Sequence, residues 1–193
     1  MTRGVEQIPW LYDAWMSLVE RLGFGRWRAW LARGAAGRTL DLGSGTGRNL
    51  PLLPAGTAAV AVEPYPWPIE RARRRAPGVP VVLARAEALP FRDGAFDCVL
   101  GGLVLCSVED PPAALAEIRR VLRPGGALRV LEHVRDERPW AAAVQDALQP
   151  AWTRFTGGCH PNRDTERAIS DAGFRVVERR AQGVMRRVAA TRP

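Results

Sequence analysis

The stretch Leu40-Asp41-Leu42-Gly43-Ser44-Gly45-Thr46-Gly47-Arg48-Asn49 decides the fold of this chain. It is typical of a strand that enters a glycine-rich bend and continues into a helix, which we expect near residues 46–53. Glycine adopts φ > 0 and has no Cβ, so the three glycines let the main chain turn sharply and approach a ligand closely. Glu63 ends the next apolar run, where a carboxylate can accept hydrogen bonds from both hydroxyls of a ribose. These features predict a nucleoside-binding crevice at the carboxyl ends of parallel strands.

The glycine spacing and the aspartate before it narrow the choice of nucleoside. A dinucleotide site has the pattern G-x-G-x-x-G, with a pyrophosphate at the helix N-terminus. This bend has G-x-G-x-G, and Asp41 beside it would repel a pyrophosphate. The carboxylate would suit a ligand with a cationic amino group and a sulfonium. We therefore expect S-adenosyl-L-methionine (SAM) as cofactor and S-adenosyl-L-homocysteine (SAH) as product. A tight turn that binds no ligand is the alternative interpretation.

Length and composition indicate one globular domain of 193 residues, with a helical cap at 1–33 and a SAM-binding core at 34–193. No segment reaches the roughly 18 uncharged apolar residues that a membrane span needs. The N-terminus shows no basic region followed by an apolar one, so we expect no export signal. Three widely spaced cysteines without a C-x-x-C pattern are typical of free thiols in a reducing cytoplasm. They argue against disulfides and against a metal site.

The net charge is +8, and all 28 basic residues are arginine. A strongly basic chain is a candidate for nucleic-acid binding. The arginines are spread over the whole chain, however, so we do not expect a nucleic-acid partner. The dense cluster Arg71-Ala72-Arg73-Arg74-Arg75 is either a solvated helix face or a contact for an anionic partner.

From residue 38 onward, apolar runs alternate with helical patterns, which predicts an α/β fold built on a mostly parallel, doubly wound sheet. The runs are nearly continuous in apolar residues, as parallel strands buried on both faces are. Strands are predicted at 38–42, 58–62, 79–84, 96–105 and 127–134. Further helices are predicted near 66–76, 111–122, 139–155 and 163–172, and a hairpin at 174–178 and 184–189.

Residues 5–33 predict two helices, broken at Gly23-Phe24-Gly25. The first carries an apolar stripe at helical spacing, and we expect this stripe to pack on the sheet. Two other interpretations stay open. The aromatic face could line an acceptor pocket as a lid, or the helix could lie on a membrane surface, an option that three acidic residues weaken. The stripe consists of Ile8, Leu11, Trp15, Leu18 and Leu22, and the acidic residues are Glu6, Asp13 and Glu20.

The chain resembles the class I SAM-dependent methyltransferases over residues 38–135. Four ordered motifs carry the resemblance: Leu40–Gly47, Val62-Glu63-Pro64, the pair Ala86–Phe91 and Asp93–Asp97, and Val121–Gly126. The resemblance implies a Rossmann-like sheet of seven strands in which the last strand is antiparallel. It also implies methyl transfer to an acceptor as the activity.

The same resemblance implies which residues contact SAM. The bend would hold the methionine portion, Glu63 the ribose, and the stretch after the third strand the adenine. Many relatives have an aspartate before the Ala86-Glu87 pair, but this chain has Arg85, so Glu87 is expected to take over recognition of the adenine amino group. By analogy, Tyr12 would touch the methionine carboxylate. The implied contacts are Tyr12, Asp41, Gly43, Ser44, Gly45, Gly47, Asn49, Glu63, Pro64, Tyr65, Ala86, Glu87, Gly102 and Leu103.

A narrower set of motifs is similar to the methyltransferase-like thiol S-methyltransferases and is near the quinone-pathway C-methyltransferases. It comprises Leu103–Val108, Leu131–Val134, and Trp152 with Gly158-Cys159, Arg163 and Thr165. That thiol-methylating family typically carries an N-terminal membrane anchor, which this sequence does not show; peripheral membrane contact stays open. The resemblance implies a small, fairly apolar acceptor, with a thiol favoured over a phenolic hydroxyl or an activated carbon.

Acceptor-side residues should follow the strands, because the crevice faces their carboxyl ends. The candidates are Cys106 and Ser107 after the fourth predicted strand and His133 after the fifth. Cys159 and His160, in the loop 157–164, could cover the acceptor. His133 titrates near neutrality and could act as a base, or it could be a structural histidine bonded to backbone. Two other functions remain open from the residues: a nucleic-acid methyltransferase and a SAM-binding module without catalysis.

Overall fold

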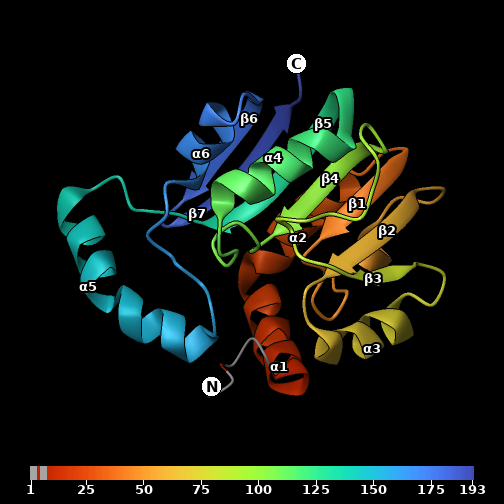
Figure 1. Ribbon diagram of the computed structural model, residues 1–193. Helices are drawn as coiled ribbons and strands as arrows, with labels where there is room; N and C mark the ends of the chain where they lie inside the picture. Colours follow the sequence, from red (N-terminus) through yellow and green to blue (C-terminus); the bar gives the residue numbers. More distant parts are fainter. Residues whose placement is uncertain (1–3, 5–7) are drawn as a thin grey trace.

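A seven-stranded sheet forms the centre of the computed structural model, which describes residue 4 and residues 8–193 (Figure 1). The strand order is β3-β2-β1-β4-β5-β7-β6, and β7 is antiparallel to both of its neighbours. This order confirms the predicted doubly wound sheet with a reversed last strand. The strands are β1 (Arg38–Leu42), β2 (Ala58–Glu63), β3 (Val81–Leu83), β4 (Phe96–Gly102), β5 (Leu122–His133), β6 (Arg175–Gln182) and β7 (Met185–Thr191).

Helices cover both faces of the sheet because alternate residues of each strand point to opposite sides. Val99 of β4 packs in the large core with residues of α4 and α6, whereas its neighbours Cys98 and Leu100 pack with Leu31 of α2. In Figure 1, α1 and α3 lie beside each other at one end of the sheet, and α5 stands away from it. The helices are α1 (Pro9–Val19), α2 (Gly25–Arg33), α3 (Pro66–Arg75), α4 (Pro111–Val121), α5 (Pro139–Thr156) and α6 (Thr165–Asp171).

The predicted helix at 46–53 is wrong. The chain after the glycine bend forms only turns and a short 3₁₀ helix, Leu50–Leu52. Pro51 and Pro54 supply no backbone N–H, so the hydrogen bonds that would continue a helix cannot form. The bend is closed instead by the N–H of Gly47, which donates to the carbonyl of Ser44 at 2.8 Å.

Several strand boundaries also differ from the prediction; β6, for example, continues to Gln182 instead of ending at 178. β4 ends at Gly102 rather than at 105, because Leu103 adopts a left-handed φ of 62° and turns the chain away. β5 begins at Leu122, which pairs with Phe96, rather than at 127. Pro124-Gly125-Gly126 therefore lies within the strand, where the pairing register shifts.

The expectation that the apolar stripe of the first helix packs on the sheet is wrong. Trp15, Leu18 and Leu22 are exposed, and Leu22 keeps 79% of its accessible surface. The opposite, polar face of α1 holds the helix in place. Asp13 receives a hydrogen bond from Thr46 and pairs with Arg48, Arg71 and Arg75. The predicted start of this helix at 5, and Glu6, lie outside the described residues.

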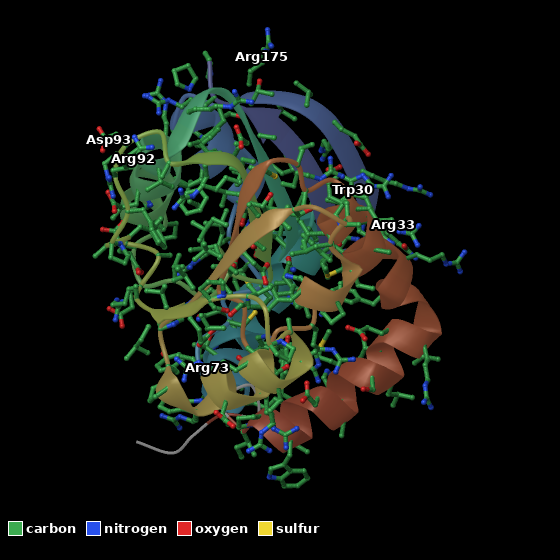
Figure 2. All side chains as sticks on the ribbon, turned by 90° about the vertical axis from the view of Figure 1, so that its right-hand side faces the viewer. Trp30, Arg33, Arg73, Arg92, Asp93 and Arg175 are labelled. Atoms are coloured by element: carbon green, nitrogen blue, oxygen red, sulfur yellow. The ribbon has the colours of Figure 1, made fainter. Side chains whose placement is uncertain are left out.

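Exposed apolar side chains also mark α5, where Trp140, Leu148 and Phe155 are more than half exposed. Within residue 4 and residues 8–193, no helix has both the length and the apolarity to cross a membrane. The four arginines labelled in Figure 2, Arg33, Arg73, Arg92 and Arg175, lie far apart at the edges of the view.

Candidate functional site

An open pocket of about 1030 Å³, including the solvent at its mouth, lies where β1, β2 and β4 end. Its walls come from the glycine bend, from the segment after β2, and from the segments after β3 and β4. Tyr12 of α1 and the loop Gly157-Gly158 complete the lining. The pocket therefore lies at the carboxyl edge of the parallel strands, where ligands bind in open α/β sheets.

The structure brings most of the predicted cofactor residues to this pocket. All of them line it except Asp41, Ser44, Gly47 and Asn49. Sequence reasoning did not select Thr46 and Trp67, which also line it. Trp67 could have been found from its position, since it follows Tyr65 by two residues at the start of a helix. The two rings stack with centroids 4.5 Å apart.

The glycine bend is shaped by close backbone approaches. Gly43 and Gly45 have φ values of 59° and 53°, a region that side-chain-bearing residues rarely adopt. A Cβ on Gly43 would lie 2.6 Å from Cγ2 of Val104, whereas a Cβ on Gly45 would meet no atom within 4 Å. Gly43 is therefore required for packing, and Gly45 leaves open space at the pocket wall.

Glu63 is a buried carboxylate at the carboxyl end of β2. Its Oε2 accepts a hydrogen bond from the N–H of Gly45 at 2.8 Å, and its Oε1 accepts one from the N–H of Tyr65 at 3.2 Å. Burial raises the pKa of Glu63 to about 7, against the effect of these two hydrogen bonds. The side chain is thus fixed against the glycine bend, and lone pairs of both oxygens remain for donors in the pocket.

Asp41 lies behind the pocket wall. Its Oδ1 accepts a hydrogen bond from Asn49 at 2.8 Å, and Asn49 in turn accepts one from Arg28 of α2 at 2.7 Å. Oδ2 of Asp41 has no hydrogen-bond partner among the described residues. Complete burial raises the pKa of Asp41 to about 6. The amide of Asn49 lies next to Gly102, which does line the pocket.

Glu87 faces the pocket, but its carboxylate is already engaged. Oε1 accepts hydrogen bonds from the backbone N–H groups of Glu109 and Asp110, at 2.9 and 3.3 Å. Burial raises the pKa of Glu87, and the backbone hydrogen bonds together with Arg85 outweigh that effect, so the pKa is lowered. Arg85, which replaces the aspartate of many relatives, forms an ion pair with Glu109 at 2.8 Å.

Glu132, which lies within the Leu131–Val134 motif, is a buried carboxylate for which the sequence alone predicts no role. It accepts hydrogen bonds from the N–H groups of Val104 and Leu105 at 2.9 Å and from that of Cys106 at 3.1 Å. Burial raises the pKa of Glu132 to about 7. These bonds fix the turn after β4, including the strained residue Leu103 on the pocket wall.

Three of the acceptor-side candidates are brought together. Cys106 and His133 form a cluster with Cys159, in which the side-chain sulfur and nitrogen atoms all lie within 4.8 Å of one another. A hydrogen bond between the two thiols raises the pKa of Cys106 and lowers that of Cys159. His160 lies apart from the cluster, because its ring nitrogen Nδ1 contacts Gln149 at 2.8 Å. Burial lowers the pKa of His160.

A comparison with protein families assigns this site to a known class. The family model described as "Methyltransferase domain" matches residues 40–144, which span β1 to the start of α5. The chain belongs to the SAM-dependent methyltransferase family. The cofactor of this methyltransferase is therefore SAM, as the glycine bend and Glu63 predict.

Individual relatives refine the comparison. The thiol S-methyltransferase TMT1B of Homo sapiens is 35% identical over 160 residues, which are 77% of this chain and 65% of that protein. An uncharacterized methyltransferase of Mycobacterium tuberculosis is 42% identical over 110 residues, which are 56% of this chain and 45% of that protein. The chain thus spans less than two thirds of the length of these curated relatives.

A solved structure resembles the methyltransferase over nearly its full length. It is a SAM-dependent methyltransferase from Thermotoga maritima, with a TM-score of 0.75 and 26% identity. The similarity covers 97% of both chains. It therefore includes the N-terminal helices and the last hairpin, as well as the residues that the family model matches.

Proposed function

We propose that this methyltransferase transfers the methyl group of SAM to the sulfur of a small, fairly apolar thiol. The observation that carries the proposal is the pocket with the glycine bend and the fixed carboxylate of Glu63 on its wall. The thiol acceptor is supported by the 35% identical relative from Homo sapiens, which is named a thiol S-methyltransferase.

Each part of SAM is assigned to residues of the pocket in this proposal. The ribose hydroxyls donate to Glu63, and the adenine lies beside the stacked rings of Tyr65 and Trp67. The methionine portion lies along Gly43, Gly45 and Tyr12. Asp41 acts from behind the wall, because its hydrogen bond orients Asn49 next to Gly102. Glu87 holds the loop before α4 as well as bordering the adenine region.

The chemistry asks the protein mainly to position two reactants. Methyl transfer from a sulfonium is an in-line displacement, in which the acceptor sulfur attacks the methyl carbon and the bond electrons remain on the sulfur of SAH. Positioning can supply roughly 7–11 kcal/mol of the barrier. A thiol depends least on a general base, because it is partly ionised near neutral pH. We place the acceptor beside Ser107, Val108 and Gly158, which line the pocket.

We also propose that residues 1–33 and 34–193 work as one methyltransferase domain in the cytoplasm. The ion pair and hydrogen bond that Asp13 of α1 makes with Arg48 and Thr46 support a single domain. The three free cysteines support a cytoplasmic location. The exposed tryptophans of α1 and α5 support peripheral contact with a membrane, which co-sedimentation with phospholipid vesicles would measure.

An assay with labelled SAM separates the acceptor classes. We expect methyl transfer to small apolar thiols, and slower or no transfer to phenols, quinols, amines and RNA. Transfer to RNA with a steep salt dependence would favour the nucleic-acid alternative instead. SAH binding without transfer to any class would favour a binding module.

A further inference from the structure

We propose that Cys106, His133 and Cys159 form a zinc site beside the cofactor pocket. The sequence argued against such a site, because the three residues lie far apart in the chain and no two cysteines have a C-x-x-C spacing. The fold brings them together from three different elements: the turn after β4, the end of β5, and the loop after α5.

The geometry of the cluster is close to that of a tetrahedral site. Zinc binds thiolate sulfur at about 2.3 Å and imidazole nitrogen at about 2.0 Å, so neighbouring ligand atoms lie about 3.3–3.8 Å apart. Sγ of Cys159 and Nδ1 of His133 are 3.7 Å apart, and the three donor atoms all lie within 4.8 Å of one another. Side-chain shifts of about 1 Å or less would therefore complete the ligand set.

The donor set suits zinc in type and charge. Two thiolates balance the charge of a divalent ion, and a thiolate–imidazole set with one open position is found in catalytic zinc sites. Cys106 and Cys159 are almost completely buried, so the ion would be shielded from bulk water. Glu132 is not a ligand in this proposal, because three backbone N–H groups engage its two oxygens.

The backbone around both cysteines is held in place before any ion binds. The carbonyl of Cys106 accepts a hydrogen bond from the N–H of His160 at 2.7 Å, which ties the two cysteine segments together. The hydroxyl of Thr153 donates to the carbonyl of Cys159 at 2.8 Å, and the hydroxyl of Thr156 accepts from its N–H at 3.2 Å. These hydrogen bonds fix the backbone from which the two sulfur ligands project, so the ligands are positioned by the fold.

The position of the cluster suggests its use. Ser107 and Gly158 line the cofactor pocket and directly adjoin Cys106 and Cys159 in the chain. This step rests on the proposed thiol acceptor: zinc held by these three residues would act as a Lewis acid that lowers the pKa of an acceptor thiol reaching it from the pocket, and the acceptor, having released its proton through the pocket mouth, would react as a thiolate. Its lone pair then forms the new S–C bond as the sulfonium S–C bond breaks, and that bond's electrons stay on SAH.

Metal titration of the reduced, chelator-treated chain tests the site without any acceptor. We expect one Co²⁺ per chain with strong thiolate-to-cobalt charge-transfer absorption, and displacement of Co²⁺ by Zn²⁺. Cys159→Ser should weaken metal binding at least tenfold and remove part of that absorption. Cys98→Ser is the matched control, because Cys98 is the buried cysteine outside the cluster. Absence of stoichiometric binding, or equal losses in the two variants, would overturn the proposal.

Two further measurements keep the test independent of variant folding and of the proposed function. X-ray absorption of the zinc-loaded wild type should show two sulfur ligands at about 2.3 Å, and a shell of oxygen and nitrogen only would overturn the site. SAH calorimetry reports whether each variant is folded. If zinc binds with two sulfur ligands but no thiol is methylated, the site stands and the thiol acceptor is refuted.

Discussion

Replacing Glu63 by glutamine should remove a pH-dependent cost of folding and, at the same time, weaken SAH binding. In the folded chain burial raises the pKa of Glu63 to about 7, from an ordinary value of 4.5. Between these two pH values the folded state holds a proton that the unfolded state has released. The free energy of unfolding therefore falls as pH rises through this window.

The size of the effect follows from the same two values. Each tenfold change in a protonation equilibrium corresponds to about 1.4 kcal/mol, so the wild type should lose about 3 kcal/mol through this one group between about pH 4.5 and pH 8. Glutamine has no proton to lose. Asp41 and Glu132, whose pKa values are also raised, titrate in both proteins and largely cancel in the difference. The stability of Glu63→Gln relative to wild type should thus rise with pH.

Urea unfolding at a series of pH values measures this difference, and calorimetry measures SAH binding. At about pH 8 the variant should bind SAH roughly 10- to 100-fold more weakly, because it loses a hydrogen bond to a charged acceptor. The wild-type affinity should approach that of the variant as pH falls below about 7, where Glu63 becomes protonated.

Glu87→Gln is the matched control, since it also removes a carboxylate from the pocket wall. The pKa of Glu87 is lowered rather than raised, so this variant should not gain relative stability as pH rises. Parallel stability profiles for wild type and Glu63→Gln would refute the buried-charge argument. Unchanged SAH affinity in Glu63→Gln at about pH 8 would refute the ribose assignment.

Three further predictions concern the wall around Glu63. Asn49→Ala should lower the free energy of unfolding by roughly 1–3 kcal/mol in urea titrations, because it removes the hydrogen-bond donor to buried Asp41. An unchanged free energy of unfolding would show that this hydrogen bond contributes no stability. Gly45→Ala should cost roughly 1–2 kcal/mol of stability, because a side chain is strained at its φ of 53°, and it should weaken SAH binding in calorimetry. Gly47→Ala should lower the melting temperature further, since its Cβ has the same strain and would also lie 2.8 Å from Cα of Ala72; equal melting temperatures would contradict the packing argument. Asp13→Asn should speed hydrogen exchange in α1 and raise the KM for SAM, because it weakens the ion pairs of Asp13 with Arg48 and Arg75 that hold α1 against the glycine bend. Unchanged hydrogen exchange would mean that other contacts hold α1.

The sequence was most informative where a residue's role depends on its near neighbours. The glycines between β1 and the 3₁₀ turn, and the carboxylate that ends β2, were predictable because strand spacing and backbone freedom are local properties. The predicted helix at 46–53 failed for a reason that was also local, since Pro51 and Pro54 remove the N–H groups that a helix needs.

The N-terminal cap shows where periodicity misled. The apolar spacing of its first helix predicted a buried stripe, but Trp15 and Leu22 are exposed and the helix is held by Asp13 on its other face. Periodicity states which residues share a face. It does not determine whether the apolar face or the charged face of the helix contacts the rest of the chain.

By itself, the order of the residues determined the sheet, the cofactor class and the wall of the pocket, because backbone geometry and the alternation of apolar runs act over short stretches of chain. Only the tertiary structure decided that Asp41 lies behind that wall and that Cys106, His133 and Cys159 meet. Side chains from distant segments become buried and come into contact only when the strands pair and the loops pack over them. A local sequence pattern therefore does not predict such contacts.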